Sequence, residues 1–361
     1  MKILLLSKYS RKGASTRLRS LQYLPYLESK GFQVTVSSLF DDQYLDQLYR
    51  HGKRAPLRMM MFYLRRLFVL LSAFKYDLIW VEKEIFPYMP ALAERVLHWL
   101  GKRYVVDYDD AIFHNYDLSG NPVLRRVLGC KIDVVMRYSS CVVAGNDYLA
   151  SRAKAAGAVR VEQVPTVVDA TRYNSKESSL AVSPVIGWIG SPSTQRYVAD
   201  IAQTLTSLCQ KYDARLLLIG ASADIVREFQ GLNVEVEPWS EASEVELIAR
   251  MDIGIMPLPD GPWEKGKCGY KLIQYMACGI PVIASPVGVN FDIVGMSQCG
   301  LLADNVAEWE TTLAQLLESS ALRQQLGRAG RQAVEDKYSL QVQAPILAGI
   351  FTQSMIVPGS K

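Results

Sequence analysis

Short apolar segments alternate with helical segments along the whole chain, and this alternation limits the fold more than any other feature. In the first half we predict strands at 2–7, 32–39, 77–82, 103–107, 140–144 and 160–164, and helices near 15–30, 57–74, 88–100, 121–138 and 147–156. A second series of strands is predicted near 185–189, 215–219, 233–237, 252–256 and 281–284. Such alternation favours parallel sheets covered by helices on both faces. We therefore predict an α/β protein with doubly wound parallel sheets.

The chain is long enough for two domains. Its 361 residues exceed what one hydrophobic core usually holds. The polar stretch 171–183 is predicted to be a linker. We assign residues 1–175 to an N-terminal Rossmann-like domain, residues 183–340 to a C-terminal one, and residues 341–361 to a final helical segment.

Composition indicates the cellular compartment in which the protein is expected. Hydrophobic residues make up 49% of the chain and charged residues 21%, which is typical of a globular protein. No apolar run approaches the roughly 20 residues that span a bilayer, and the run at 2–7 is too short for a secretory signal. The six cysteines show no paired spacing, so we expect reduced thiols and a cytoplasmic protein.

The two halves differ in charge. Residues 1–170 hold 25 Lys and Arg against 16 Asp and Glu, a net charge of +9, whereas residues 171–361 hold 15 against 20, a net charge of −5. The first half is therefore the one attracted to an anionic partner. No basic stripe interleaved with aromatic residues and no helix-turn-helix pattern is visible, so nucleic acid is not an expected partner.

The stretch KCGYKLIQYMACGIPVIASPVG, residues 267–288, predicts a helix followed by a buried strand. Gly279 is expected to end the helix, because glycine tolerates a positive φ at a helix C-terminus. Glycines and cationic or aromatic side chains gather where the helix begins: Gly266, Lys267, Gly269, Tyr270 and Lys271. A helix N-terminus with added lysines is a phosphate-binding arrangement. The alternative is an ordinary helix–strand unit.

This stretch resembles the nucleotide-sugar signature of the retaining glycosyltransferases of family four, the group 1 family of the GT-B fold, which includes bacterial surface-polysaccharide enzymes. In that family two glutamates separated by seven residues precede a phrase much like MACGIPVIAS. Those two positions are Gly266 and Gln274 here. The resemblance implies two Rossmann-like domains facing across a cleft, with the acceptor on the first, the nucleotide sugar on the second, and the last helix crossing back to the first.

A second donor element is the turn after the strand at 185–189. Gly190 would let a diphosphate approach the backbone, and the hydroxyls that follow it could bond phosphate. In the resembled family this turn carries an arginine and then a lysine, and these places fall on Ser191 and Arg196. The alternatives are a plain strand–helix loop for the turn and a core role for Trp239, which the resemblance places beside the base. The predicted donor residues are Gly190, Ser191, Arg196, Gly220, Trp239, Lys267, Gly269, Tyr270, Lys271 and Gln274.

Carboxylates are densest just after the strand at 103–107. Asp109 and Asp110 are the predicted catalytic residues, with His114 as a further one, because carboxylates there can orient acceptor hydroxyls or accept a proton. Asp107 is expected to face the core. The D-x-D spacing of Asp107 and Asp109 occurs in metal-dependent transferases, but the GT-B resemblance implies no metal. We expect no cofactor, only a nucleotide-diphosphate-sugar co-substrate.

A glycine loop follows the first strand. Gly13, Thr16 and Arg17 are the predicted acceptor-binding residues, on a helix that we expect Ser15 or Thr16 to cap. Arginines in a first helical turn oppose the macrodipole preference for acids, which suggests an anionic ligand. The alternative is a solvated basic surface.

Residues 50–74 combine arginines with methionine, leucine and phenylalanine. Arg54, Arg58 and Arg65 are spaced to share one helical face. A basic amphipathic helix can lie on an anionic leaflet, as a peripheral membrane contact. The alternative is a helix that packs on the sheet with its arginines in water.

Together these features predict a transferase of the hexosyltransferase kind. It would move a sugar from a nucleotide-diphosphate-sugar donor to a saccharide acceptor, with retention of anomeric configuration. The acceptor would be linked to polyprenyl diphosphate, and the setting would be surface polysaccharide biosynthesis. The alternatives are a nucleotide-sugar epimerase or hydrolase on the same fold, and a non-catalytic subunit that binds sugar nucleotides.

Overall fold

The computed structural model describes residues 1–51, 56–173 and 183–355, and these form two compact units. Unit 1 contains residues 1–166 and the segment from Gln343 on, and unit 2 contains Val167–Val342. Most of the predicted linker, residues 174–182, lies outside the described residues.

The boundary between the units differs from the predicted one at residue 175. Residues 167–173 pack with unit 2, because Val168 bridges to Ser339 and the Tyr173 side chain belongs to the core of that unit. The backbone of Val168 accepts a hydrogen bond from the N–H of Leu340 at 2.8 Å.

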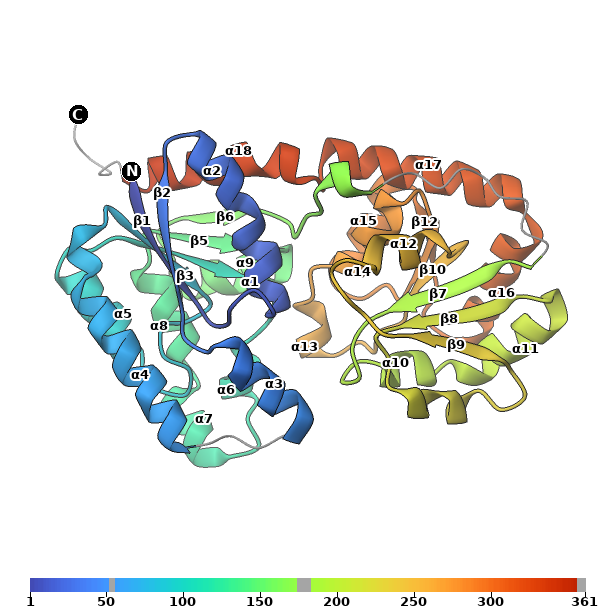
Figure 1. The fold of residues 1–361 in the computed structure, drawn as a ribbon, viewed down its shortest axis with the longest axis horizontal. Helices are drawn as coiled ribbons and strands as arrows, with labels where there is room; N and C mark the ends of the chain where they lie inside the picture. The colour runs from blue at the N-terminus through green and yellow to red at the C-terminus, as the bar shows by residue number, and fades with distance from the viewer. Residues whose placement is uncertain (52–55, 174–182, 356–361) are drawn as a thin grey trace. The chain divides into compact units, whose positions relative to one another are not determined.

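Unit 1 is built on a six-stranded parallel sheet in the order β2-β1-β3-β4-β5-β6 (Figure 1). The strands are β1 (Lys2–Ser7), β2 (Gln33–Ser38), β3 (Leu78–Glu82), β4 (Tyr104–Tyr108), β5 (Cys141–Ala144) and β6 (Val161–Gln163). All residues of β3, β4 and β5 are buried, as is usual for a sheet covered on both faces. The register sets Glu82 opposite Asp107 at the carboxyl edge.

Helices cover both faces of this sheet. They are α1 (Ala14–Arg19), η1 (Leu21–Tyr23), α2 (Leu24–Ser29), α3 (Asp42–His51), α4 (Pro56–Leu71), η2 (Ala73–Lys75), α5 (Leu92–Trp99), α6 (His114–Asp117), α7 (Pro122–Leu128), α8 (Lys131–Tyr138), α9 (Asp147–Ala155) and α18 (Leu340–Gln353). The single helix predicted near 15–30 is broken, because Ser20 leaves helical geometry and Pro25 starts a new helix. The helix predicted at 121–138 is likewise interrupted, between α7 and α8.

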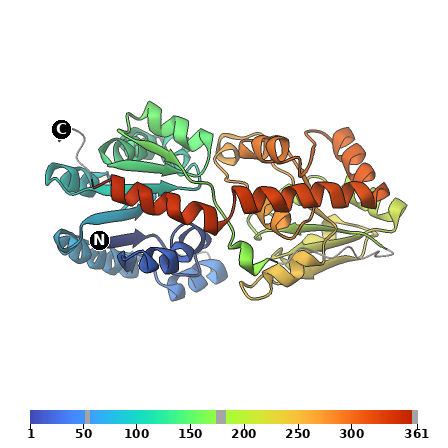
Figure 2. The same cartoon turned by 90° about the horizontal axis from the view of Figure 1, so that it is seen from above.

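The last helix packs on unit 1. The rings of Phe351 and Trp80 lie 4.9 Å apart between centroids. The Arg103 guanidinium donates to the Ser354 carbonyl at 3.0 Å. Figure 2 shows α18 running along the sheet of unit 1.

Unit 2 repeats the architecture with the strand order β12-β11-β10-β7-β8-β9. Its strands are β7 (Val185–Ile189), β8 (Arg215–Ile219), β9 (Val234–Glu237), β10 (Ile253–Met256), β11 (Val282–Ala284) and β12 (Gly300–Leu302). Its helices are η3 (Ala170–Arg172), α10 (Arg196–Ala199), α11 (Ala202–Tyr212), η4 (Ala223–Glu228), α12 (Glu244–Ala249), α13 (Pro262–Lys265), α14 (Tyr270–Ala277), α15 (Val289–Ser297), α16 (Val306–Glu318) and α17 (Ser320–Asp336). The sequence did not predict β12, a three-residue edge strand.

Alternation along each strand of unit 2 builds two hydrophobic cores. Leu216 and Leu218 enter the core that contains Trp188 and Trp309. Leu217 and Ile219 point to the opposite face and join the core formed with α14. The prediction of two doubly wound parallel sheets is confirmed.

Strand order locates one switch point in each unit, where neighbouring strands lead to helices on opposite faces. It lies between β1 and β3 in unit 1, and between β7 and β10 in unit 2. Ligands of such sheets bind beyond the carboxyl ends of the strands at this point. The residues that follow β3 and β7 are therefore the first place to seek a site.

Candidate functional site

In unit 2 a lysine ammonium lies at the switch point. The Nζ atom of Lys271 is 4.4 Å from the ring centroid of Trp188, which lies in β7, the strand that Gly190 follows. Within the part of the chain that the structure describes, no carboxylate pairs with Lys271. Burial, followed by the charge of Lys267, lowers the pKa of Lys271 to about 7. Lys271 is partly buried and lies on an aromatic face without a carboxylate, so its ammonium is available to an anionic ligand.

Gly190 makes room for this lysine. A Cβ atom placed there would overlap the Trp188 ring and lie 2.9 Å from Lys271 Nζ. Glycine is therefore needed at this position for packing. The sequence had suggested another reason, which is the close approach of a diphosphate to the backbone.

The turn after Gly190 is held by its own hydroxyls. Ser191 Oγ lies 2.9 Å from Ser193 Oγ, and the Ser191 N–H donates to Thr194 Oγ1 at 3.2 Å. Ser191 is exposed, so it remains a predicted phosphate contact.

Arg196 begins α10 and points to solvent, with 71% of its side chain exposed. Its guanidinium stacks on the Tyr197 ring and donates to the Tyr197 hydroxyl at 3.2 Å. That hydroxyl donates to Oε1 of the buried Glu264 at 2.5 Å. Glu264 was not singled out in the sequence; it lies two positions before Gly266, where the resembled motif has a glutamate.

The helix predicted from Gly269 is present as α14. Gly269 is its N-cap with φ +64°, and a Cβ there would lie 2.5 Å from Ile293 Cδ1. Tyr270 is the first helical residue, and the N–H of Lys267 donates to the Glu264 carbonyl at 3.0 Å. Gly279 has φ +70°, as predicted for the residue that ends the helix.

Gly220 and Trp239 lie at the same edge of the sheet. Gly220 follows β8 with φ +76°, and a Cβ there would meet the Gly190 carbonyl and approach Trp239 Cβ to 3.1 Å. Trp239 is 37% exposed, and its indole N–H donates to Glu244 Oε2 at 2.9 Å. The alternative of a fully buried core tryptophan is therefore wrong.

Gln274 is buried, and its amide donates to the Tyr173 hydroxyl at 3.4 Å. Tyr173 donates in turn to Glu244 Oε1 at 3.2 Å. Position 274, which holds a glutamate in the resembled motif, is thus linked through Tyr173 to the Glu244 carboxylate of α12.

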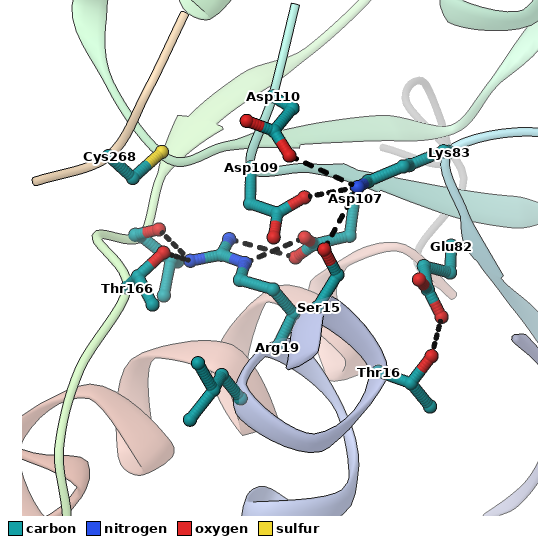
Figure 3. Close-up of polar contacts among 12 residues, drawn as sticks. Ser15, Thr16, Arg19, Glu82, Lys83, Asp107, Asp109, Asp110, Thr166 and Cys268 are labelled. Carbon is teal, nitrogen blue, oxygen red and sulfur yellow. Dashed lines mark hydrogen bonds and ion pairs between the residues drawn. The ribbon is translucent and has the colours of Figure 1, made fainter. Parts of the chain in front are cut away.

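In unit 1 the switch point holds a cluster of charged side chains, which Figure 3 shows. Lys83 Nζ lies 2.8 Å from Asp109 Oδ1 and 3.6 Å from Asp110 Oδ2, and it donates to Ser15 Oγ at 2.9 Å. Although burial opposes it, Lys83 lowers the pKa of Asp109. The two predicted catalytic carboxylates therefore share one buried cation, and Asp110 is the more exposed of the two.

Lys83 was not predicted. It is a non-glycine residue with φ +66°, a conformation that costs about 1–3 kcal/mol and tends to mark functional sites. The sequence signal was present, since Glu82-Lys83-Glu84 places three charges at the carboxyl end of the buried strand β3. Glu84 pairs with Lys131, so each of the three has its own partner.

Asp107 faces the core, as expected. It forms a two-pronged ion pair with Arg19, at 2.8 and 2.9 Å, and both side chains are buried. The two carboxylates of the D-x-D spacing are thus held by different cations of the chain.

The acceptor loop differs from its prediction. Gly13 is the N-cap of α1, and no side chain caps the helix, so capping by Ser15 or Thr16 is wrong. Thr16 lies inside the helix, where its hydroxyl donates to Glu82 Oε2 at 2.6 Å. Arg17 is buried and donates to the Arg11 carbonyl at 3.4 Å, so it is not part of a solvated basic surface.

Glu82 has an orphan oxygen. Its Oε1 atom is buried and, in the described residues, has no hydrogen-bond partner, while Oε2 also accepts from the N–H of Lys8. Burial raises the pKa of Glu82.

His114 opens α6 with both ring nitrogens engaged. Nδ1 lies 2.8 Å from Asp117 Oδ1, and Nε2 lies 2.8 Å from the Tyr148 hydroxyl. One of these bonds would have to open before His114 could exchange a proton with a substrate.

The arginines of α4 turn toward the protein. Arg66 is buried and donates to the carbonyls of Ser7 and Ser37, and Arg58 pairs with Asp41. Arg65 donates to the Ser38 carbonyl at 2.5 Å, and Arg54 lies outside the described residues. Of these three arginines, Arg66 is buried, Arg58 is partly buried and Arg65 is exposed, so the alternative of arginines in water is wrong for Arg66 but not for Arg65. Contact with a membrane stays a prediction.

The outward side of α4 is apolar. Its exposed apolar side chains are Leu57, Met60, Met61, Leu64, Leu67, Phe68 and Leu71, and Arg65 is exposed among them. None of the described helices combines the length and the apolar character needed to cross a bilayer.

Comparisons with known proteins agree with this architecture. Residues 183–319 match the family model described as Glycosyl transferases group 1. N-acetyl-alpha-D-glucosaminyl L-malate synthase of Bacillus anthracis is 25% identical over 149 residues, which cover 39% of this chain and 38% of that protein. The match thus spans well under half the length of this curated relative.

Solved structures resemble the whole chain. Sucrose-phosphate synthase from Thermosynechococcus elongatus has a TM-score of 0.74 at 14% identity, covering 98% of both chains. Anabaena Alr3699/HepE in complex with UDP has a TM-score of 0.73 at 17% identity, covering 98% of this chain and 100% of that one. At these identities the likeness shows the fold alone, which is GT-B, as the sequence predicted.

Proposed function

We propose that this protein transfers a sugar from a nucleotide-diphosphate-sugar to a saccharide acceptor, since residues 183–319 match the family model of the group 1 glycosyl transferases. The observation that carries the proposal is the Lys271 ammonium beside Gly190, at the switch point of unit 2. It offers a diphosphate a cation that no carboxylate of the described residues neutralises. The Alr3699/HepE structure has also been solved with UDP-glucose, which supports a donor of this class.

The acceptor side of the proposal rests on unit 1. Asp110 is the carboxylate best placed to bond an acceptor hydroxyl, since it is less buried than Asp109 and is oriented by Lys83. We assign Asp109 to holding Lys83. Transfer with retention would use the donor phosphate as base and would require little acid–base chemistry from these residues.

We further propose a lipid-linked acceptor, with polyprenyl diphosphate as the carrier, in surface polysaccharide assembly at the inner face of the membrane. Support comes from the apolar outward side of α4. From residue 53 to residue 76 the sequence contains six lysines and arginines and no Asp or Glu, so nothing in this segment repels an anionic leaflet. An apolar helix face with basic surroundings fits contact with an anionic bilayer.

A thermal-shift screen over nucleoside diphosphates and their sugars tests the donor assignment. A ligand that binds only the folded state raises the melting temperature by mass action. We expect one base to stand out and Lys271→Ala to lose most of its shift. Lys211→Ala is the matched control, because Lys211 also lies over an aromatic ring, that of Tyr212, but is exposed on α11. Equal shifts in both variants would remove Lys271 from the donor site.

Turnover assays separate the enzyme classes. A transferase needs an acceptor to consume the donor. Release of free or isomerised sugar without acceptor would favour a hydrolase or an epimerase, and donor binding without turnover would favour a non-catalytic subunit.

A further inference from the structure

We propose that Glu244 supplies the buried negative charge of the donor site in unit 2 and that it positions Trp239 as the platform for the nucleobase. This inference rests on the proposed function. It assigns to α12 a carboxylate that the resembled motif would place at position 274 of α14.

Three hydrogen bonds make up the network, and two of them connect α12 to α14 through Tyr173. Trp239 Nε1 donates to Glu244 Oε2 at 2.9 Å. Tyr173 donates its hydroxyl to Glu244 Oε1 at 3.2 Å, and Gln274 Nε2 donates to the Tyr173 hydroxyl at 3.4 Å. Each oxygen of the carboxylate thus has its own donor.

Most of the network is buried. Glu244, Tyr173 and Gln274 are 4%, 3% and 2% exposed, whereas Trp239 is 37% exposed. Burying polar groups this deeply is costly unless they are hydrogen-bonded. Tyr173 also hydrogen-bonds the partly buried Tyr270, and the network fixes Trp239 at its other end.

Glu244 has no cationic partner within the described residues. Its charge is stabilised by the two neutral donors and by its place in the first turn of α12, where a helix favours an acid. A carboxylate held only by such donors is sensitive to any second negative charge nearby.

This sensitivity explains the glutamine at position 274. The Tyr173 hydroxyl has one proton, for which Glu244 Oε1 is an acceptor at 3.2 Å, and Tyr270 is a further hydrogen-bond neighbour of that hydroxyl. A glutamate at 274 would compete for the same proton from the other side, whereas the amide of Gln274 donates and completes the chain. Gln274 is therefore the neutral partner that a carboxylate at 244 requires.

The exposed end of the network lies where a nucleotide is expected. Trp239 follows β9, and its Cβ lies close to Gly220, which in turn packs on the Gly190 carbonyl. An aromatic face at this edge can stack on any nucleobase, since every base has a π-face. Fixing the indole beforehand reduces the side-chain ordering that binding would otherwise require.

A charge swap tests the inference. The variants are Glu244→Gln, Gln274→Glu and the double variant that carries both. The probes are UDP, GDP, ADP, CDP and TDP, of which the one that binds wild type best is used throughout. We expect Glu244→Gln to weaken binding about tenfold, as for the loss of a hydrogen bond to a charged group.

Melting without ligand gives a second readout. Gln274→Glu should lower the melting temperature, because it adds a second buried carboxyl near Glu244. The loss should grow as pH rises, since the new carboxyl is protonated in the folded protein and ionised in the unfolded one. The double variant should recover most of the lost melting temperature and most of the affinity. Tyr173→Phe removes the hydroxyl that links Glu244 to Gln274, and it should abolish this recovery.

The outcomes are distinct. Losses that simply add in the double variant, or a Glu244→Gln protein that binds like wild type, would overturn the inference. If wild type binds none of the diphosphates, the proposed function fails, while the melting temperatures of wild type and of the variants, Tyr173→Phe included, still decide whether Glu244 and Gln274 are coupled through Tyr173.

Discussion

The ammonium of Lys271 lies 4.4 Å from the ring centroid of Trp188, in a cation–π contact. Within the described residues no carboxylate pairs with it. Burial and Lys267 lower the pKa of this group to about 7. A free donor site therefore holds a lysine that is only partly charged near neutral pH. An arriving diphosphate would restore the charge, so donor binding and protonation are linked.

Donor affinity is expected to fall as pH rises. Above about pH 7 the free protein loses the Lys271 proton and the complex keeps it, so the dissociation constant should increase by up to about tenfold per pH unit. Calorimetry in buffers of different ionisation enthalpy would measure the proton uptake. Lys271→Arg keeps its charge in this range and should remove the slope. An equal slope in that variant would contradict the assignment.

The same lysine should reduce stability when no ligand is bound. Its pKa is lower in the folded than in the unfolded protein, so the unfolded chain binds more protons between about pH 7 and about pH 10, and the free energy of unfolding rises with pH across that window. Lys271→Met should therefore melt above wild type at pH values below about 7 and lose this advantage near pH 10. A variant that melts below wild type at low pH would show that the charge is compensated.

Gly190→Ala should damage the same site by crowding. The added methyl overlaps the Trp188 ring and displaces Lys271 Nζ, an overpacking that typically costs about 1–3 kcal/mol. We expect a lower melting temperature and a loss of nucleotide binding. Gly295→Ala is the control, because this glycine of α15 has open space around it. Equal effects of the two changes would mean that crowding of Trp188 and Lys271 does not explain the loss.

Local patterns predicted most of the fold. Runs of apolar, β-branched residues located every strand except β12, which has three residues and lies at the edge of its sheet. The helix interruption at Ser20, which is buried between α1 and η1, was missed.

Site residues were predicted where a motif names them and missed where the fold brings them together. Lys83 meets Ser15 across 68 residues of sequence, and Arg66 reaches the Ser7 carbonyl across 59. The period of a helix fixes which residues share a face but does not show which face meets the sheet. The burial of Arg66 and the ion pair of Arg58 with Asp41 were for this reason not predicted.

Lys83→Met should destabilise unit 1 strongly. It leaves Asp109 and Asp110 without their buried cation, and breaking a buried ion pair costs about 3–5 kcal/mol. Because Lys83 lowers the pKa of Asp109, the stabilisation is present above the unfolded pKa and disappears as pH falls through the folded one. The difference in melting temperature from wild type should thus shrink in acid. Adding Asp109→Asn should restore part of the loss, and a pH-independent deficit would contradict this account.

Membrane contact through α4 should depend on its apolar side chains more than on its arginines. Phe68→Ser should weaken co-sedimentation with phosphatidylglycerol vesicles about tenfold, since burying one large apolar side chain contributes about 1.5–3 kcal/mol. Added salt should have a smaller effect, because Arg58 and Arg66 already bond to unit 1. Val159→Ser is the control, as Val159 is an equally exposed apolar residue outside α4. Vesicle binding that survives Phe68→Ser but vanishes in high salt would indicate electrostatic adsorption and would refute the apolar contact.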